Sequence, residues 1–422
     1  MVGILNSYAD ELVRHNVYDS YSRGTIIRHY RGVSDVICVH SGSHPYFMYL
    51  QEGVPTTYAM YVDLDTVCDF EIYNDTVYFC GYRRVNTSSV AVIGFFDLTT
   101  YPSPYSHMAY YLDLSWITDV RALEVDMFAA RKHVVGVGGE LRGNAMMVDL
   151  IDEGSFWRVN YSTVYNDSLN LVDLAITKSY VLVTSVLGDE NAHGLLWFYQ
   201  KPNVSGATIF SLPNVSYYDF GYNFSYCYYV RKRWADQFVT AFSLGMNQIG
   251  TSRYVVQSFN GMALQNKLML IEQNVERFRL RDLGADVENS KVQLLVNTWY
   301  NSGLQGSFIY ELPIDMASGV TMVSAHSCIG IEATSLDETN ASNHFVLSGY
   351  DLANTYPHFI KYKSGVMNAG CLPEIETVAE KRGMDFSTNE KKNTYDYVLM
   401  VPVESPLDYK EMLMKDDCHT VR

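Results

Sequence analysis

Short runs of alternating apolar and polar residues recur along the chain, and the pattern is clearest over residues 68–97. There, alternating apolar residues lead to Asn74 and Asp75, a pair that favours a tight turn, and a second apolar run follows it. After a polar loop, residues 90–96 form a third apolar run. This pattern predicts a three-strand antiparallel meander.

Six further stretches repeat this meander. They span residues 32–50, 118–150, 172–199, 236–272, 278–310 and 328–351. Seven units with variable spacing indicate blades that pack face to face and carry insertions in their loops. The sequence therefore predicts an all-β fold, a seven-bladed β-propeller of antiparallel meander sheets. β-sandwich domains, or a six- or eight-bladed propeller, are the alternatives.

The repeats also suggest a domain organisation. Residues 1–422 are expected to form a single propeller domain, and its last residues, 404–422, are expected to be a C-terminal tail. The predicted blades are 25–60, 61–112, 113–165, 166–230, 231–275, 276–325 and 326–403. A closed ring needs its last blade completed by the other end of the chain, and residues 25–30 are expected to lie beside the C-terminal strands.

Composition supports a large β core. Hydrophobic residues make up 48% of the chain and charged residues 18%, so enough apolar surface is available to bury. The formal net charge of -16 argues against sequence-independent binding to nucleic acid or to anionic lipid, because phosphate groups require a positive field. The one basic run, Arg231-Lys232-Arg233, is interpreted as a solvated turn.

Cysteine usage and the first residues bear on the compartment. The seven cysteines are scattered and form no C-x-x-C pair, which argues against a zinc site. Only Cys68 and Cys80 could meet across a hairpin, either as a disulfide or as two free thiols. No apolar run approaches the length of about 20 residues that spans a bilayer. The first residues lack the basic and apolar regions of a signal peptide. Either the protein is cytoplasmic or a leader was removed.

The repeated form carries a family resemblance. An acidic residue and alternating apolar residues precede a turn, then VYFCG at 77–81 or FVLSG at 345–349, and a polar loop leads into IGFFD at 93–97. This form is similar to uncharacterised extracytoplasmic β-propeller proteins of gut Bacteroidetes. The resemblance implies an extracytoplasmic protein that is secreted or associated with the outer membrane. A lipid anchor would then have been removed together with the leader. A cytoplasmic location is the alternative. It carries over no functional residue.

Two sequence motifs that superficially suggest chemistry are better explained by structure. The glycine-rich run at 136–141 opens into another strand, so no helix N-terminus is present to bind a pyrophosphate. His40 and His44 are four residues apart, but this spacing places two metal ligands together only on a helix.

An aspartate precedes the predicted inner strand in five of the repeats. These residues are Asp35, Asp69, Asp119, Asp173 and Asp236. If they converge at one mouth of the channel, they form an acidic ring that could bind a hard cation such as calcium. No other cofactor is expected. In the alternative, each aspartate caps its own turn by accepting a backbone hydrogen bond.

Six aromatic residues alternate with smaller residues between Tyr218 and Tyr228. A period of two places their rings on one face of an extended chain. An exposed face would stack on sugar rings or on a partner's apolar surface, with Tyr222 and Tyr226 as the ligand-binding residues. A buried face would instead pack neighbouring blades together.

Two functions are compatible with these features. The first is a noncatalytic extracytoplasmic binding protein that uses propeller loops to bind a protein or a glycan. The alternative is a carbohydrate-active enzyme, a glycoside hydrolase or lyase, with acidic residues at the channel mouth. The lack of a recognisable catalytic motif favours the first.

Overall fold

The computed structural model describes most of the chain as β-strand. The described residues are 11–16, 22–31, 34–41, 44–51, 56–99, 108–140, 145–164, 169–187, 193–211, 216–219, 225–244, 250–286, 291–300, 305–313, 324–329, 331–338, 344–351, 357–363, 375–378 and 396–417. No helix in these ranges is long and apolar enough to cross a bilayer.

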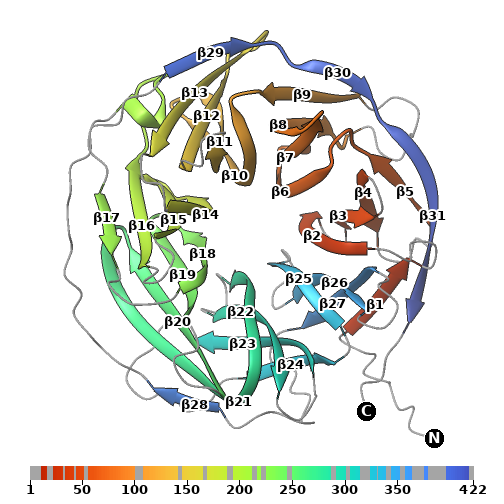
Figure 1. The fold of residues 1–422 in the computed structure, drawn as a ribbon, viewed down its shortest axis with the longest axis vertical. Helices are drawn as coiled ribbons and strands as arrows, with labels where there is room; N and C mark the ends of the chain where they lie inside the picture. Colours follow the sequence, from red (N-terminus) through yellow and green to blue (C-terminus); the bar gives the residue numbers. More distant parts are fainter. Residues whose placement is uncertain are drawn as a thin grey trace, which may run out of the picture.

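The strands are arranged as antiparallel sheets around a central axis, which establishes an all-β propeller (Figure 1). The first two blades contain β2 (Ser22–Arg31), β3 (Ser34–Ser41), β4 (His44–Gln51) and β5 (Thr56–Tyr61), then β6 (Thr66–Tyr73), β7 (Thr76–Val85), β8 (Ser88–Asp97) and β9 (Met108–Leu114). The next two contain β10 (Ile117–Phe128), β11 (Arg131–Glu140), β12 (Ala145–Asp152) and β13 (Trp157–Val164), then β14 (Leu169–Ile176), β15 (Tyr180–Leu187), β16 (His193–Gln200) and β17 (Ser216–Asp219). A short 3-10 helix, η1 (Ile209–Ser211), precedes β17.

The rest of the ring is built from one wide blade and one closing blade. The wide blade contains β18 (Ser225–Trp234), β19 (Gln237–Leu244), β20 (Gly250–Asn260), β21 (Ala263–Asp286), β22 (Lys291–Tyr300), β23 (Gln305–Pro313) and β24 (Ser324–Ile329). The closing blade contains β25 (Ile331–Glu338), β26 (His344–Asp351), β27 (Pro357–Lys363) and β1 (Glu11–Asn16).

The prediction of seven separate blades is wrong, and the six-bladed alternative describes the ring. The fifth and sixth predicted meanders share one continuous sheet, because β21 runs through 24 residues and Val275 pairs with Gly250 on one side and Tyr300 on the other. Residues 272–278 contain no Gly or Pro that would end the strand. The second half of β21 consequently returns to the central axis as an inner strand of the wide blade.

The two ends of the chain close the ring, but not with the predicted strand. Residues 25–30 lie in β2, which is an inner strand, whereas β1 pairs with β27 on one side and with β31 (Asp408–Asp417) on the other. β31 also pairs with β5 of the first blade. The segment predicted as a C-terminal tail thus contains a strand that joins the first and last blades.

The C-terminal segment adds outer strands to several other blades. β28 (Ile375–Val378) pairs with β21, β29 (Asp396–Met400) with β13, and β30 (Val403–Pro406) with β9. Figure 1 shows these strands, coloured blue, along the outside of the ring.

Apolar faces of neighbouring blades form the core. Phe47 of β4 lies with its ring centroid 5.2–5.4 Å from those of Phe70, Phe79 and Phe96, which belong to the second blade. All four rings are buried. The predicted turn at Asn74 and Asp75 is confirmed, since both residues have positive φ between β6 and β7. Cys38, Cys68 and Cys80 are free thiols.

The glycine-rich run 136–140 lies within β11, in close contact with the inner strand β10. A Cβ atom on Gly138 would overlap the Asp119 carbonyl oxygen, at a position where the β10–β11 register is irregular. Gly81 has the same relation to Thr66 in the second blade. These glycines therefore allow the two strands to approach at a bulge.

The Gly138→Ala variant is expected to lose about 2 kcal/mol or more of unfolding free energy, because backbone must move to admit the methyl group. Gly139→Ala is the matched control, since its Cβ would meet only side-chain atoms, the nearest being Asp119 Oδ1 at 3.1 Å. Urea unfolding of both variants measures the difference. Equal stabilities would contradict the close approach.

Candidate functional site

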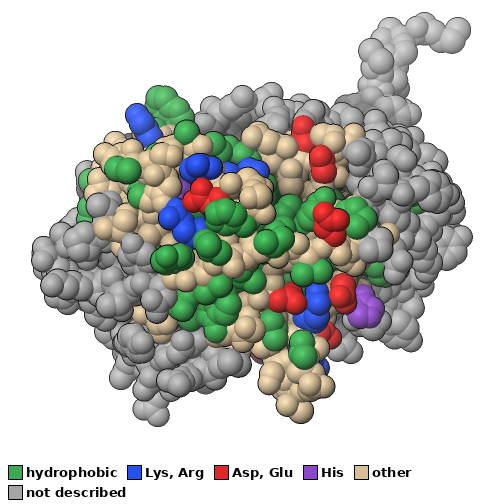
Figure 2. Space-filling model, turned by 90° about the horizontal axis from the view of Figure 1, so that it is seen from above, with side chains coloured by type: hydrophobic (Ala, Val, Ile, Leu, Met, Phe, Trp, Pro, Cys, Tyr) green, Lys and Arg blue, Asp and Glu red, His purple; other side chains and the backbone are tan. Residues whose placement is uncertain are grey.

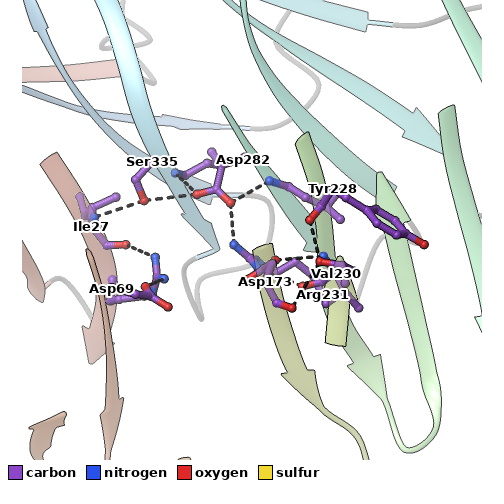
Figure 3. A network of polar contacts seen from close by, with 12 residues as sticks. Ile27, Asp69, Asp173, Tyr228, Val230, Arg231, Asp282 and Ser335 are labelled. Atoms are coloured by element: carbon purple, nitrogen blue, oxygen red, sulfur yellow. Dashed lines mark hydrogen bonds and ion pairs between the residues drawn. The ribbon is translucent and has the colours of Figure 1, made fainter. Parts of the chain in front are cut away.

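Charged side chains from the inner strands meet at the centre of the ring. We call this set the channel cluster: Arg28, Asp69, Glu71, Glu124, Asp173, Arg231, Asp282 and Asp337. Figure 3 shows part of it, with side chains from opposite sides of the axis joined by hydrogen bonds and ion pairs.

Three aspartates of the cluster bind the backbone of a neighbouring inner strand. Asp69 Oδ2 accepts from the Leu123 amide at 3.1 Å, Asp173 Oδ2 from the Val230 amide at 3.0 Å, and Asp282 Oδ2 from the Leu336 amide at 2.9 Å. Each carboxylate thus joins its own blade, or its own half of the wide blade, to the next inner strand along the chain.

An irregular register precedes each of these aspartates. The strand pairing shifts between Val67 and Asp69, between Leu171 and Asp173, and between Leu280 and Asp282. β-Bulges increase local twist and change the direction of the next side chain. The bulge therefore turns the carboxylate out of its own sheet and toward its neighbour.

Two arginines balance part of the negative charge. Arg231 on β18 donates to Asp173 at 2.6 Å and to Asp282 at 2.7 Å, and Arg28 on β2 donates to Asp69 at 2.7 Å. Burial raises the pKa of Asp173 to about 6, against the lowering effect of Arg231. Burial lowers the pKa of Arg231, but Asp173 and Asp282 outweigh it and hold that pKa above its ordinary value. The guanidinium therefore stays charged between the two carboxylates.

Among the described contacts, neither glutamate of the cluster accepts a hydrogen bond from an arginine. Arg28 Nε lies 3.8 Å from Glu71 Oε2, which is too far for a hydrogen bond. Burial raises the pKa of Glu71 to about 7; Arg28 lowers it, and Asp337 and Asp69 raise it further. Burial, followed by the charge of Glu71, raises the pKa of Glu124 well above its ordinary value. Perturbed carboxyl groups of this kind are typical of functional sites.

Of the five aspartates predicted to form a ring, the structure brings Asp69 and Asp173 into the channel cluster and places the other three elsewhere. Asp35 lies 2.8 Å from His29 Nδ1, and Asp119 binds Arg121 at 2.7 Å. Asp236 accepts from the Ser179 amide and hydroxyl, both at 2.7 Å, so it binds the turn between β14 and β15 of the neighbouring blade and not its own turn.

No group of three or more potential ligands among the described residues is arranged to hold a metal ion. Calcium binding stays a prediction.

The aromatic run does not form one continuous strand. Its beginning lies in β17 and its end in β18, which belong to different sheets. Tyr228 is fully buried, and residues 220–224 between the strands, including Tyr222, lie outside the described residues. Tyr226 is in β18, but its side chain is not described. A ligand-binding role for Tyr222 and Tyr226 stays a prediction.

Sequence reasoning missed most of the channel cluster. Arg231 was interpreted as part of a solvated turn, which is wrong, because it lies within β18 and bridges two carboxylates. Asp282 was not among the five predicted aspartates. Its context, Leu-Arg-Asp-Leu, matches Leu-Val-Asp-Leu around Asp173, and this similarity could have identified it.

The outer rim carries a second unusual surface, an exposed apolar edge at residues 397–403. Five of the nine exposed large hydrophobic residues in the described chain lie there: Tyr397, Val398, Leu399, Val401 and Val403. β29 pairs with β13 and β30 with β9, and no other described strand pairs with either of them. Figure 2 views this rim and shows hydrophobic side chains gathered among charged ones.

Comparison with known proteins finds only distant similarity to solved structures. No protein-family model and no curated protein matches the chain. The β-propeller domain of the Trilobed protease from Pyrococcus furiosus is 8% identical with a TM-score of 0.44, over 84% of this chain and 98% of that chain. A cobalt-substituted ACO from Synechocystis is 8% identical with a TM-score of 0.41, over 92% and 95%. Drosophila Semaphorin 2a is 8% identical with a TM-score of 0.37, over 81% and 76%.

Proposed function

We propose that this protein is a noncatalytic binding protein that holds a protein partner on the rim of its propeller, at the exposed apolar edge. The exposure of this edge is the observation that carries the proposal. The side chains of Leu399, Val401 and Val403 are 57%, 71% and 65% exposed. Contiguous apolar surface of this kind marks interaction sites in soluble proteins.

The open edge of β29 suggests how the partner binds. An unpaired strand presents a row of free N–H and C=O groups, which native proteins usually protect with lysine, proline or a covering element. No Lys or Arg occurs between Lys392 and Lys410. An extended partner segment would add to the sheet through main-chain hydrogen bonds, with alternate apolar side chains giving specificity.

Charge indicates the partner's chemistry. The exposed apolar edge is flanked in sequence by Asp396 and Glu404, and the chain carries a net charge of -16. A second copy of the same chain would be repelled, whereas a strand with basic residues near its ends would be attracted. We therefore favour a basic partner strand. Extracytoplasmic location, membership of the Bacteroidetes propeller family and binding of a glycan remain proposals.

The Leu399→Lys/Val401→Lys variant is expected to lose at least about 90% of partner capture, since two charges enter the apolar contact. Capture is measured with a photo-crosslinking residue at position 397 and extract from the source organism. Trp234→Lys is the matched control, because Trp234 is 70% exposed and lies in β18, whose sheet contains neither β29 nor β30. Capture that survives in the double variant, with the fold intact by circular dichroism, would contradict the proposed site.

A carbohydrate-active enzyme is the second candidate, and the Glu71–Glu124 pair favours it. Burial raises the pKa of both carboxyl groups, and glycoside hydrolysis uses a carboxyl group with a raised pKa as its general acid. If this candidate is correct, Glu124→Gln should abolish turnover on a panel of polysaccharides while Val204→Lys does not. A panel without turnover by the unmodified protein would exclude the candidate for those substrates.

A further inference from the structure

We propose that the turns after the inner strands β10, β14 and β18, together with the segment after β16, form a second interaction surface that binds an acidic protein segment around the exposed indole of Trp234. We call it the turn surface: Met127, Lys178, Val204, Lys232 and Trp234. This inference goes beyond the proposed function, because the turn surface is separate from the exposed apolar edge and fits a partner of the opposite charge.

Backbone and side-chain hydrogen bonds hold these turns together. The Lys178 amide donates to the Ala235 carbonyl at 2.9 Å, so the β14–β15 turn contacts the β18–β19 turn. The Lys201 amide donates to the Ser179 carbonyl at 2.8 Å, which holds the segment after β16 against the same β14–β15 turn. Lys201 Nζ also donates to Asp126 Oδ2 at 2.8 Å, near the end of β10. Turns from three blades therefore lie side by side on one face of the ring.

Large apolar side chains on this face are exposed. Trp234 ends β18 and is 70% exposed. Met127, next to Asp126, is 43% exposed, and Val204, three residues after Lys201, is 65% exposed. A tryptophan that becomes buried against a partner contributes a large apolar area and one N–H donor, and it is among the residues that dominate binding energy at interfaces. The position of Trp234 therefore marks the centre of a contact site.

The charge exposed on the turn surface is positive. Both carboxylate oxygens of Asp236 accept hydrogen bonds from the β14–β15 turn, and Asp126 pairs with Lys201. Lys178 and Lys232 are exposed, and neither forms an ion pair within the described residues. A chain with a net charge of -16 thus presents two uncompensated lysines beside an exposed tryptophan. Acidic groups are attracted to this surface, although the chain as a whole repels them.

The partner that fits is a protein segment with an apolar residue between carboxylates. Its carboxylates would contact Lys178 and Lys232, and its apolar residue would pack on Trp234. An acidic polysaccharide would also satisfy the lysines and stack on the indole. Met127 and Val204, however, offer no hydrogen bond to sugar hydroxyls, whereas they match apolar side chains of a protein. We therefore favour an acidic protein segment.

Fluorescence anisotropy tests the proposal with two labelled peptides of equal length, a glutamate-rich peptide with a central Leu-Phe pair and its counterpart with lysine in place of glutamate. The glutamate peptide is expected to bind, with an affinity that falls as salt is raised, and the lysine peptide is not. Trp234→Ala should weaken binding at least about tenfold, because the central apolar contact is lost. Lys178→Glu/Lys232→Glu should abolish binding, because both charges are reversed.

The β7–β8 turn provides matched controls on the opposite face of the ring, because successive turns of a meander lie at opposite ends of its strands. It also carries an exposed basic residue beside an exposed apolar one, Arg84 and Val85, the latter 49% exposed. Arg84→Glu and Val85→Ala should leave binding of the glutamate peptide unchanged. Circular dichroism of all variants checks that the fold is intact.

Equal affinity for the two peptides would overturn the proposal, as would binding of the glutamate peptide that Trp234→Ala and the double lysine variant leave unchanged. If soluble polygalacturonate binds more tightly than the glutamate peptide and depends on Trp234 in the same way, the occupant is an acidic glycan and not a protein segment. If the protein dimerises in sedimentation experiments and Trp234→Ala abolishes the dimer, the occupant is a second copy of the chain. Both results would contradict a separate acidic protein partner.

Discussion

Arg231→Met is expected to destabilise the protein by about 3 kcal/mol, since it leaves Asp173 and Asp282 as unpaired, largely buried charges. We take the lower end of the range for broken buried pairs, because the Arg231 side chain retains 25% exposure. The methionine side chain fills much of the same volume, so lost packing contributes little. Urea unfolding at pH 7 and moderate salt measures the change.

Two further variants separate the roles of Arg231. Arg231→Lys keeps the charge but cannot bind two carboxylates through one planar group, so an intermediate loss is expected. Arg83→Met breaks exposed ion pairs with Asp63 and Asp113, whose side chains are 63% and 47% exposed, and should cost less than about 1 kcal/mol. An Arg231→Met protein as stable as the Arg83→Met control would show that the channel cluster does not join the blades.

A chain that ends at Pro406 is expected to lose on the order of 5 kcal/mol, because removal of β31 breaks its pairing with both β5 and β1. Among the described strands, no other one links the first and last blades at the outer rim. Amide hydrogen exchange should then accelerate first in β1, β5 and β27. Unfolding of the whole ring should follow at lower denaturant concentration.

A chain that ends at Asp417 is the control, since it removes only the five residues after β31. Its stability and exchange rates should match those of the full chain. If the chain ending at Pro406 keeps full protection in the first and last blades, the contacts between inner strands β2 and β25 close the ring on their own.

The sequence identified the repeated meander because its strands obey simple rules. Alternation, the Asn74-Asp75 turn and the abundance of aromatic residues indicated β6–β8 correctly. The sequence-based prediction failed at β21, because the number of blades depends on whether this strand ends near residue 275 or continues. The pairing of Val275 with strands on both sides keeps it continuous, and no local turn residue reveals that.

The candidate site was only partly predictable for a related reason. Asp69 and Asp173 were singled out by their position in the repeat, and they lie at the centre. Asp236 looked equivalent by sequence, but it lies in the turn between β18 and β19. The prediction failed there because β18, the inner strand that precedes Asp236, was not recognised. Ion pairs across the axis join residues more than 50 positions apart, which no local pattern encodes.

Hydrogen exchange of residues 396–406, with and without the captured partner, tests the proposed function most directly. We expect the amides of β29 and β30 to be protected in the complex, while the inner strands β6, β10 and β14 are unchanged. Protection confined to the inner strands or to the turns around the channel, with residues 396–406 unaffected, would contradict binding at the rim.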